Sequence, residues 1–271
     1  MTGWFLWPAC LSLLYWVAYS VICEMDGVKI TMMTNSWFAP FLVNLTEYIE
    51  TEDIEWAKIL RANYKVVRDE YIHYVKEIKP AKRYRNYDAF QGIDTTRIPW
   101  DVVMLKLYYK DLDDYKYFPK TRELLRTVPG CSMVMFSILH PKKYLPPHRG
   151  PHNGVLRYHL GLITDNRKDV YIEVQGERRT WCDGCDLMFD DTLVHHAYND
   201  GDTTRVVLFL DIVRIWKTNS KILNFILYYI NFFMLYNSSG NYTVRDVIRR
   251  FNKNISSDFD VDHEYRNKRL Y

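Results

Sequence analysis

Histidine is concentrated in one part of this sequence. Six of its eight histidines lie between positions 140 and 196, where a random scatter would place fewer than two. Imidazole nitrogens bind Fe(II), Zn(II) or Cu(II), so histidines near the ends of strands are candidate metal ligands. His148 lies just after a Pro-Pro loop and before an expected strand, and His195 begins another strand far along the chain. This region is therefore the first candidate for a metal site.

An arginine downstream of His195 indicates that the same region binds an anion. Arg205 opens a strongly apolar stretch that runs as far as Asp211. A guanidinium entering a core strand needs an anionic partner, because a buried charge without one is costly. Arginine holds carboxylates through two parallel hydrogen bonds, so a bound carboxylic acid would satisfy Arg205.

The other histidines of this region have simpler explanations. His140 and His152 are expected to be loop residues. His195 and His196 are adjacent, and adjacent residues of a strand face opposite sides, so one of them at most is expected to bind a metal. His159 keeps two interpretations, as a residue of a ligand pocket or as a hydrogen-bonded core histidine.

Two residue pairs imitate catalytic motifs. Cys182 and Cys185 flank Asp-Gly, a dipeptide that favours a hairpin turn and would set the two cysteines across from each other. A disulfide or two unreactive thiols is expected there rather than a zinc site, because Cys131 stands alone and supplies no second pair. Asp190 and Asp191 are adjacent and imitate a pair of catalytic acids.

The elements that carry these residues are short strands. They are apolar, often β-branched or aromatic, and separated by turns rich in Pro, Gly, Asn and Asp. They span residues 102–109, 132–139, 155–164, 170–174, 187–189, 194–198 and 205–213. Their number and even spacing predict a mainly β fold with flanking helices, a sandwich or jelly roll.

Apolar segments with helical character flank the strands. Residues 51–79 show helical spacing up to Pro80 and predict one long amphipathic packing helix. Residues 4–23 carry no charge and are just long enough to span a bilayer. An uncleaved membrane anchor is favoured over a cleaved signal peptide, because no basic residue precedes them. Residues 222–236 are either a helix packed on the domain or an interfacial membrane helix.

Composition narrows the class of protein. With 271 residues, 48% of them hydrophobic and 25% charged, the chain is neither disordered nor collagen-like. A net charge of +3 gives no indication of binding to nucleic acid. Four acceptor triplets for N-glycosylation begin at Asn44, Asn237, Asn241 and Asn254. Together with the expected anchor they favour a glycoprotein whose bulk lies in a secretory lumen, that of the endoplasmic reticulum.

Several stretches, in this order, carry a resemblance to a known family. They are residues 136–141 (FSILHP), 147–151 (PHRGP), 156–162 (LRYHLGL), 179–181 (RTW), 189–191 (FDD), His195 and 205–211 (RVVLFLD). The set resembles the aspartyl/asparaginyl β-hydroxylase family, which includes bacterial lipid A hydroxylases. The resemblance implies a double-stranded β-helix, a cupin-like jelly roll, and a dioxygenase that depends on Fe(II) and 2-oxoglutarate.

The resemblance also assigns the iron ligands. By position, His148 and His195 bind Fe(II). The resemblance places Asp190 and Asp191 in the segment that leads to His195, so they are interpreted as structural support for that loop. Most enzymes of this class complete the site with a carboxylate, but the third position here is Gly150. Animal aspartyl/asparaginyl hydroxylases are similar in having glycine there. We expect water at that coordination position and weaker metal binding, because two neutral ligands do not compensate the charge of Fe(II).

The cosubstrate pocket is assigned in the same way. Arg205 matches the residue that grips the distal carboxylate of 2-oxoglutarate. Ser137, Arg157 and His159 match positions that line the pocket. Strand alternation places Arg157 and His159 on one face and turns Tyr158 towards packing on the other.

These inferences define three segments and three candidate functions. Residues 1–30 form the membrane anchor or signal segment, 31–215 the dioxygenase domain, and 216–271 a helical and basic tail. The first function is hydroxylation of the β-carbon of Asp or Asn in a protein substrate, favoured by Gly150 and the glycosylation triplets. The alternative is hydroxylation of an acyl chain of a membrane lipid, favoured by the compact domain with its apolar segments. A catalytically inactive jelly-roll binding module is the third.

Overall fold

A large antiparallel sheet forms the centre of the fold. The computed structural model describes residues 46–78, 82–83, 100–107, 109–150 and 154–214. Within these residues the large sheet has the strand order β1-β10-β7-β12-β5-β3-β2, with β4 paired to β3. Its strands are β1 (Tyr48–Ile49), β2 (Lys82–Arg83), β3 (Trp100–Leu107), β4 (Lys110–Asp111), β5 (Cys131–Leu139), β7 (Val155–Ile163), β10 (Asp186–Phe189) and β12 (Arg205–Val213).

A smaller antiparallel sheet covers one side of the large one. Its strand order is β6-β11-β8-β9. The strands are β6 (Lys143–His148), β8 (Val170–Val174), β9 (Glu177–Thr180) and β11 (His195–Asn199). Successive strands alternate between the two sheets from β5 to β8, which is the crossover pattern of a jelly roll. The predicted mainly β fold is therefore confirmed, and both of its sheets are antiparallel.

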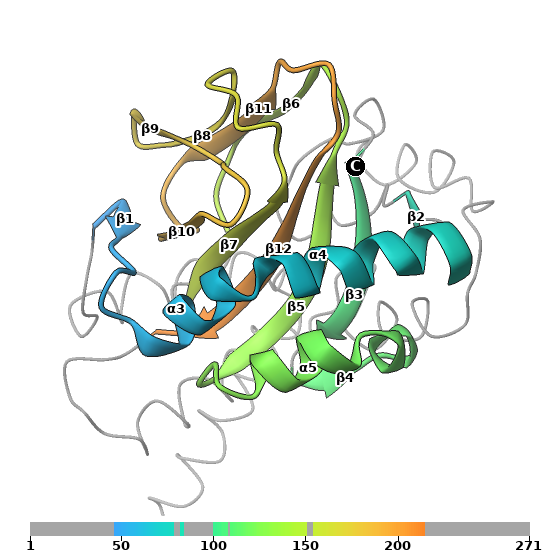
Figure 1. Ribbon diagram of the computed structural model, residues 1–271. Coiled ribbons are helices and arrows are strands. Elements are labelled where there is room, and N and C mark those ends of the chain that lie inside the picture. Colours follow the sequence, from blue (N-terminus) through green and yellow to red (C-terminus); the bar gives the residue numbers. More distant parts are fainter. Residues whose placement is uncertain (1–45, 79–81, 84–99, 108, 151–153, 215–271) are drawn as a thin grey trace, which may run out of the picture.

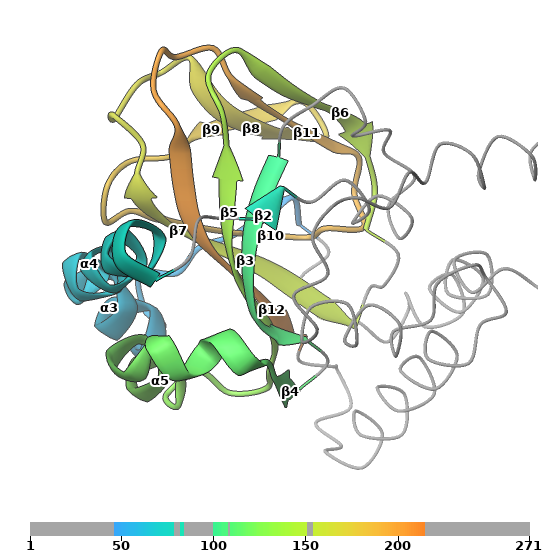
Figure 2. The same cartoon turned by 90° about the vertical axis from the view of Figure 1, so that its right-hand side faces the viewer.

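Helices cover the other face of the large sheet (Figures 1 and 2). They are α3 (Glu55–Ala62), α4 (Tyr64–His73) and α5 (Pro119–Leu125). One hydrophobic core lies between these helices and the large sheet, and a second lies between the two sheets. The central strands β5, β7 and β12 are therefore buried on both faces, which explains their nearly continuous apolar sequences.

The predicted single helix over residues 51–79 is interrupted. Asn63 separates α3 from α4, with backbone angles of φ −109° and ψ 15° that leave the helical region. Its side-chain amide donates a hydrogen bond of 2.8 Å to the carbonyl of Ile59. Asparagine side chains compete in this way for backbone groups, which favours helix ends over helix interiors. The helical segment then ends in a π-helical turn over Tyr74–Ile78.

Strand β6 was not expected from the sequence. It contains Pro146 and Pro147, which predicted a loop, and it ends at His148. Proline lacks a backbone donor, but β6 is an edge strand with β11 as its neighbour, and an edge position tolerates proline. The consequence is that His148 sits on a paired strand rather than on a loop.

No helix among the described residues is long and apolar enough to span a membrane. The expected anchor at residues 4–23, the segment 222–236 and the four glycosylation triplets lie outside the described residues.

Candidate metal and anion site

The two predicted iron ligands lie side by side. His148 at the end of β6 is paired across the small sheet with His195 at the start of β11. Their ring centroids are 4.1 Å apart, with an angle of 55° between the ring planes. Residues separated by more than forty positions in sequence therefore present two imidazoles at one place.

Backbone carbonyls set the orientation of both rings. Nδ1 of His148 lies 2.8 Å from the carbonyl oxygen of Pro146, and Nδ1 of His195 lies 2.8 Å from that of Leu193. A carbonyl oxygen can only accept, so each Nδ1 carries the proton and donates it. Each Nε2 therefore has a lone pair available for a metal. In many known metal sites the same tautomer is fixed by a hydrogen bond from the other ring nitrogen.

Burial keeps both imidazoles neutral. It lowers the pKa of His148 to about 3, and the neighbouring His195 lowers it as well. Burial lowers the pKa of His195 to about 4, against the opposing effect of the Leu193 carbonyl. Because metal ions bind neutral imidazole, neither ligand has to lose a proton first at neutral pH.

A carboxylate reaches the site from Asp191. Its Oδ1 lies 3.3 Å from Nε2 of His195, and it forms a buried ion pair with Arg157. A Cβ atom added to Gly150 would lie 1.5 Å from Oδ2 of Asp191, so this carboxylate fills the space of a side chain at position 150. Burial raises the pKa of Asp191, and the guanidinium of Arg157 opposes that shift.

The donor set fits a divalent metal. Two neutral imidazoles with a lone pair on each Nε2, and a carboxylate adjacent to one of them, suit Fe(II), and Asp191 supplies negative charge that the histidines lack. Asp191 also shares its charge with Arg157, and the described part of the chain contains no ready-made cluster of three His, Cys, Asp or Glu ligands. The carboxylate therefore stands beside two ligands rather than completing a conventional triad.

Arg205 has no anionic partner among the described residues. It faces the space between the sheets with only 2% of its surface exposed. Its Nη1 has long contacts to Ser137, 3.4 Å to Oγ and 3.5 Å to the carbonyl oxygen, and its Nε has no hydrogen-bond partner in the described residues. Burial lowers the pKa of Arg205 to about 9. The predicted need of this arginine for an anion is not met within the described structure.

His159 is buried beside Arg205 without hydrogen bonds. Neither of its ring nitrogens has a partner among the described residues, so the interpretation as a satisfied core histidine is wrong. Its ring packs against Phe209 and Phe189 at centroid distances of 4.9 and 5.2 Å. Burial lowers its pKa well below the ordinary value, and the charge of Arg205 adds to this. Arg205 and His159 therefore form a candidate cradle for a small acid, because buried polar groups are usually hydrogen-bonded.

Arg157 differs from the other predicted pocket residues. Its Nε donates to Oδ1 of Asp211 at 3.0 Å, and its Nη1 pairs with Asp191. Both carboxylates are buried, and Asp211 lies directly opposite Arg157 on β12. The charge of Arg157 is therefore already compensated, and the residue links the cradle to the carboxylate beside the histidines. Tyr158 points away as predicted, with its ring 5.0 Å from that of Trp56.

The remaining candidate residues lie away from this cradle or outside the described structure. His140 is bonded to Asp101 at 2.7 Å, and His196 contacts the ring of the exposed Tyr144. His152 lies outside the described residues. Asp190 supports the loop before His195, as predicted, through Arg214 at 2.5 Å.

Sequence reasoning missed two further residues of the site. Asp191 was assigned support alone, although it lies against His195, and Trp181 was quoted without a role. The indole ring of Trp181 covers the guanidinium of Arg205 at 4.6 Å. The sequence points to these two residues only through the family resemblance, because Trp181 lies in the RTW stretch and Asp191 in the FDD stretch.

The neutral buried histidines predict that acid destabilises the metal-free protein. His148, His159 and His195 have lowered pKa values in the folded state. Below the ordinary histidine pKa, about 6.5, the unfolded state binds more protons than the folded state, so stability is lost as the pH falls. The expected loss per imidazole grows as the pH falls and approaches about 1.4 kcal/mol per pH unit below about pH 6, measured by urea unfolding between about pH 7 and pH 5.

A substitution at His159 provides the control for this measurement. The variant His159→Phe lacks one of the three groups, so its stability should fall less steeply with acid. An unchanged pH dependence in His159→Phe would contradict the assignment of His159 as a buried neutral imidazole.

Comparisons with known proteins identify the family. Residues 61–215 match the model of the family described as aspartyl/asparaginyl beta-hydroxylase. The chain is 36% identical over 186 residues to the ornithine lipid ester-linked acyl 2-hydroxylase of Rhizobium tropici, covering 66% of this chain and 64% of that protein. It is 29% identical over 168 residues to human aspartyl/asparaginyl beta-hydroxylase, covering 60% of this chain and 22% of that protein. The matches thus span less than two thirds of each relative.

Solved structures add little. A predicted oxalate decarboxylase of Thermotoga maritima has 15% identity and a TM-score of 0.29, over 42% of this chain and 80% of that one. This score supports no functional inference. The family match covers more than half of the sequence and includes both strands that carry the paired histidines. The chain belongs to the aspartyl/asparaginyl β-hydroxylase family.

Proposed function

We propose that this protein is a hydroxylase that depends on Fe(II) and 2-oxoglutarate. The observation that carries the proposal is the pairing of His148 and His195, with ring centroids 4.1 Å apart and both Nδ1 atoms bonded to carbonyls. The unpaired, buried Arg205 supports it, because a dicarboxylic acid supplies the anion that this residue lacks. An inactive binding module is disfavoured, since it gains nothing from keeping these three groups together.

Each group has a separate task in this proposal. His148 and His195 would hold Fe(II) through Nε2, with Asp191 supplying negative charge beside them. Arg205 and Ser137 would bind the distal carboxylate of 2-oxoglutarate. When bound, Fe(II) supplies the coupling of dioxygen activation to oxidative decarboxylation of 2-oxoglutarate.

The apolar surroundings have a task as well. Phe189 and Phe209 pack around His159 and keep water from the cosubstrate. Exclusion of water strengthens the interaction of Arg205 with a carboxylate and protects reactive species from side reactions.

The proposed reaction adds a hydroxyl group to an unactivated C–H bond of a substrate in one of two classes. The β-carbon of Asp or Asn in a protein is supported by the human relative and by the lack of a carboxylate at Gly150. The acyl chain of a membrane lipid is supported by the higher identity to the Rhizobium tropici lipid hydroxylase. A membrane anchor at residues 4–23 is compatible with both.

A lumenal location is also proposed. The disulfide between Cys182 and Cys185 supports it, because disulfides persist in oxidising compartments such as the endoplasmic reticulum. The four glycosylation triplets agree with this compartment.

The experiment uses the full chain with Fe(II), ascorbate and 2-oxoglutarate, offered either small disulfide-rich protein domains or an extract of membrane lipids. We expect release of succinate together with one added oxygen atom in one of the two pools, measured by mass spectrometry. His148→Ala is the control and should release no succinate above background. If neither pool supports iron-dependent release of succinate, the proposal is wrong.

A further inference from the structure

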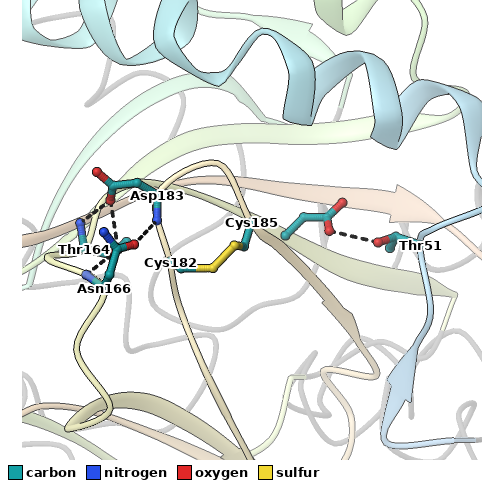
Figure 3. The surroundings of a disulfide bond; sticks show 7 residues. Thr51, Thr164, Asn166, Cys182, Asp183 and Cys185 are labelled. Carbon is teal, nitrogen blue, oxygen red and sulfur yellow. Dashed lines mark hydrogen bonds between the residues drawn. A yellow bond between two sulfur atoms is a disulfide. The ribbon is translucent and has the colours of Figure 1, made fainter.

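A disulfide joins Cys182 to Cys185 in the turn between β9 and β10 (Figure 3). Cys182 and Cys185 are bonded to each other, with their Cα atoms 5.1 Å apart, and the amide of Cys185 donates to the carbonyl of Cys182 at 3.0 Å. The turn they close contains Gly184 with a φ of +80°, a conformation that suits glycine. Two alternatives were expected at this Asp-Gly turn, a disulfide or two unreactive thiols, and the structure has the disulfide.

The turn is docked on the strand that carries His159. Gly161 of β7 donates to the carbonyl of Cys185 and accepts from the amide of Gly184, both at 2.9 Å. A Cβ on Gly161 would lie 2.1 Å from the carbonyl oxygen of Cys182, so the close approach requires glycine. Gly161 follows His159 by two residues on the same face of the strand. The position of the turn is thereby tied to one wall of the cradle.

Trp181 connects the turn to Arg205. It directly precedes Cys182 and is 1% exposed. Its ring lies 4.6 Å from the guanidinium carbon of Arg205 and 6.0 Å from the ring of His159. The indole Nε1 has no hydrogen-bond partner among the described residues. The residue next to the disulfide therefore forms a wall of the cradle and offers an unused donor.

Other contacts hold the two sides of the turn but not Cys182. Asp183 accepts from the amide and hydroxyl of Thr164, both at 2.8 Å, and its own amide donates to Asn166 at 2.8 Å. On the far side, Asp186 is bonded to Thr51 at 2.9 Å. Without the disulfide, the contacts of Asp183 and Asp186 would remain, whereas Cys182 would be linked to Cys185 by the backbone hydrogen bond alone.

We propose that the Cys182–Cys185 disulfide positions Trp181 against Arg205, so that reducing this disulfide weakens binding of 2-oxoglutarate. This inference rests on the proposed function. Cys185 is exposed and Cys182 half-buried, so a reductant can reach the bond. A dithiol reductant transfers two electrons and two protons in two exchange steps, giving two cysteine thiols and its own disulfide. The protein then becomes sensitive to the thiol–disulfide balance of its compartment.

The test is titration of 2-oxoglutarate into the full chain loaded with Mn(II). Two samples are compared: the oxidised protein, and protein that has been reduced with a dithiol which is then removed. Loss of a desolvated cation–π contact predicts an affinity about three- to thirtyfold lower after reduction. The double variant Cys182→Ser/Cys185→Ser should bind with the reduced affinity under both conditions. Cys131→Ala is the matched control, because this buried thiol lies elsewhere, and it should respond to reduction like the parent protein.

Further measurements separate positioning from general destabilisation. Affinity for Mn(II) alone should be unchanged by reduction, because the histidines are held by other contacts. Hydrogen exchange should increase at the amides of Gly161 and Gly184. Equal 2-oxoglutarate affinity before and after reduction would overturn this inference alone, as would a parallel loss of Mn(II) affinity. No binding of 2-oxoglutarate to the oxidised protein would overturn the proposed function and this inference together.

Discussion

Replacing Arg205 with methionine is expected to stabilise the protein without ligand and to weaken its binding of 2-oxoglutarate at least thirtyfold. Arg205 is 2% exposed and has no carboxylate partner among the described residues. Methionine replaces this uncompensated buried charge with an apolar side chain of similar length. The free energy of unfolding should therefore rise by about 1–2 kcal/mol. Loss of the charged partner of a buried carboxylate should cost about 2–5 kcal/mol in binding, at least a thirtyfold loss of affinity.

The opposite signs make this prediction specific. Thermal unfolding without 2-oxoglutarate should give a higher midpoint for Arg205→Met than for the parent, and calorimetric titration should show the lost affinity. Arg205→Lys keeps a charge but loses the bidentate geometry, so it should bind the ligand with an intermediate affinity.

A second buried arginine provides the matched control. Arg214 is 1% exposed and pairs with Asp190 at 2.5 Å. The same substitution, Arg214→Met, leaves a buried carboxylate without its partner and should destabilise the protein by about 3–5 kcal/mol. If Arg205→Met destabilised the protein as strongly, Arg205 would already have an anionic partner, and its assignment to a ligand would be wrong.

The strands were predictable because their hydrophobic pattern is local. The strands expected at 170–174 and 205–213 have the observed bounds, Val170–Val174 and Arg205–Val213. β6 was missed because its two prolines carry a strong turn signal, and tolerance of proline depends on the strand being at a sheet edge. The break at Asn63 was missed because apolar spacing continues across it, while the interruption depends on one side-chain hydrogen bond.

Site residues that the family resemblance assigns could be predicted from the sequence. Residues whose role depends on their ion-pair partners could not be predicted as well. His148, His195 and Arg205 were chosen by type and position, and the structure places the two histidines together. The ion pairs that Arg157 makes could not be foreseen, because its partners come from distant segments. Strand register between β7 and β12 brings Asp211 opposite Arg157, and such a register follows from the whole sheet rather than from local sequence.

Gly150→Ala is the second substitution with a large expected effect. Its Cβ would lie 1.5 Å from Oδ2 of Asp191, and the amide of Gly150 donates to the Asp191 carbonyl at 2.7 Å, which prevents the two backbones from separating easily. The carboxylate must then leave its ion pair with Arg157. A broken buried pair costs about 3–5 kcal/mol, measurable by urea unfolding. Affinity for Mn(II) should fall as well, because Asp191 no longer lies beside His195.

Exchanging the residues at positions 150 and 191 tests whether the clash between them causes this loss. The double variant Gly150→Asp/Asp191→Gly removes the clash and returns a carboxylate from the opposite side, so it should recover much of the lost stability and Mn(II) affinity. Gly201→Ala is the control for a glycine in a loop, since its Cβ would lie 3.1 Å from Asn199 Oδ1, a close contact that needs a shift of only a few tenths of an ångström. Parent-like stability and metal affinity in Gly150→Ala would mean that Asp191 is free to move, and that its carboxylate does not serve the metal site from this position.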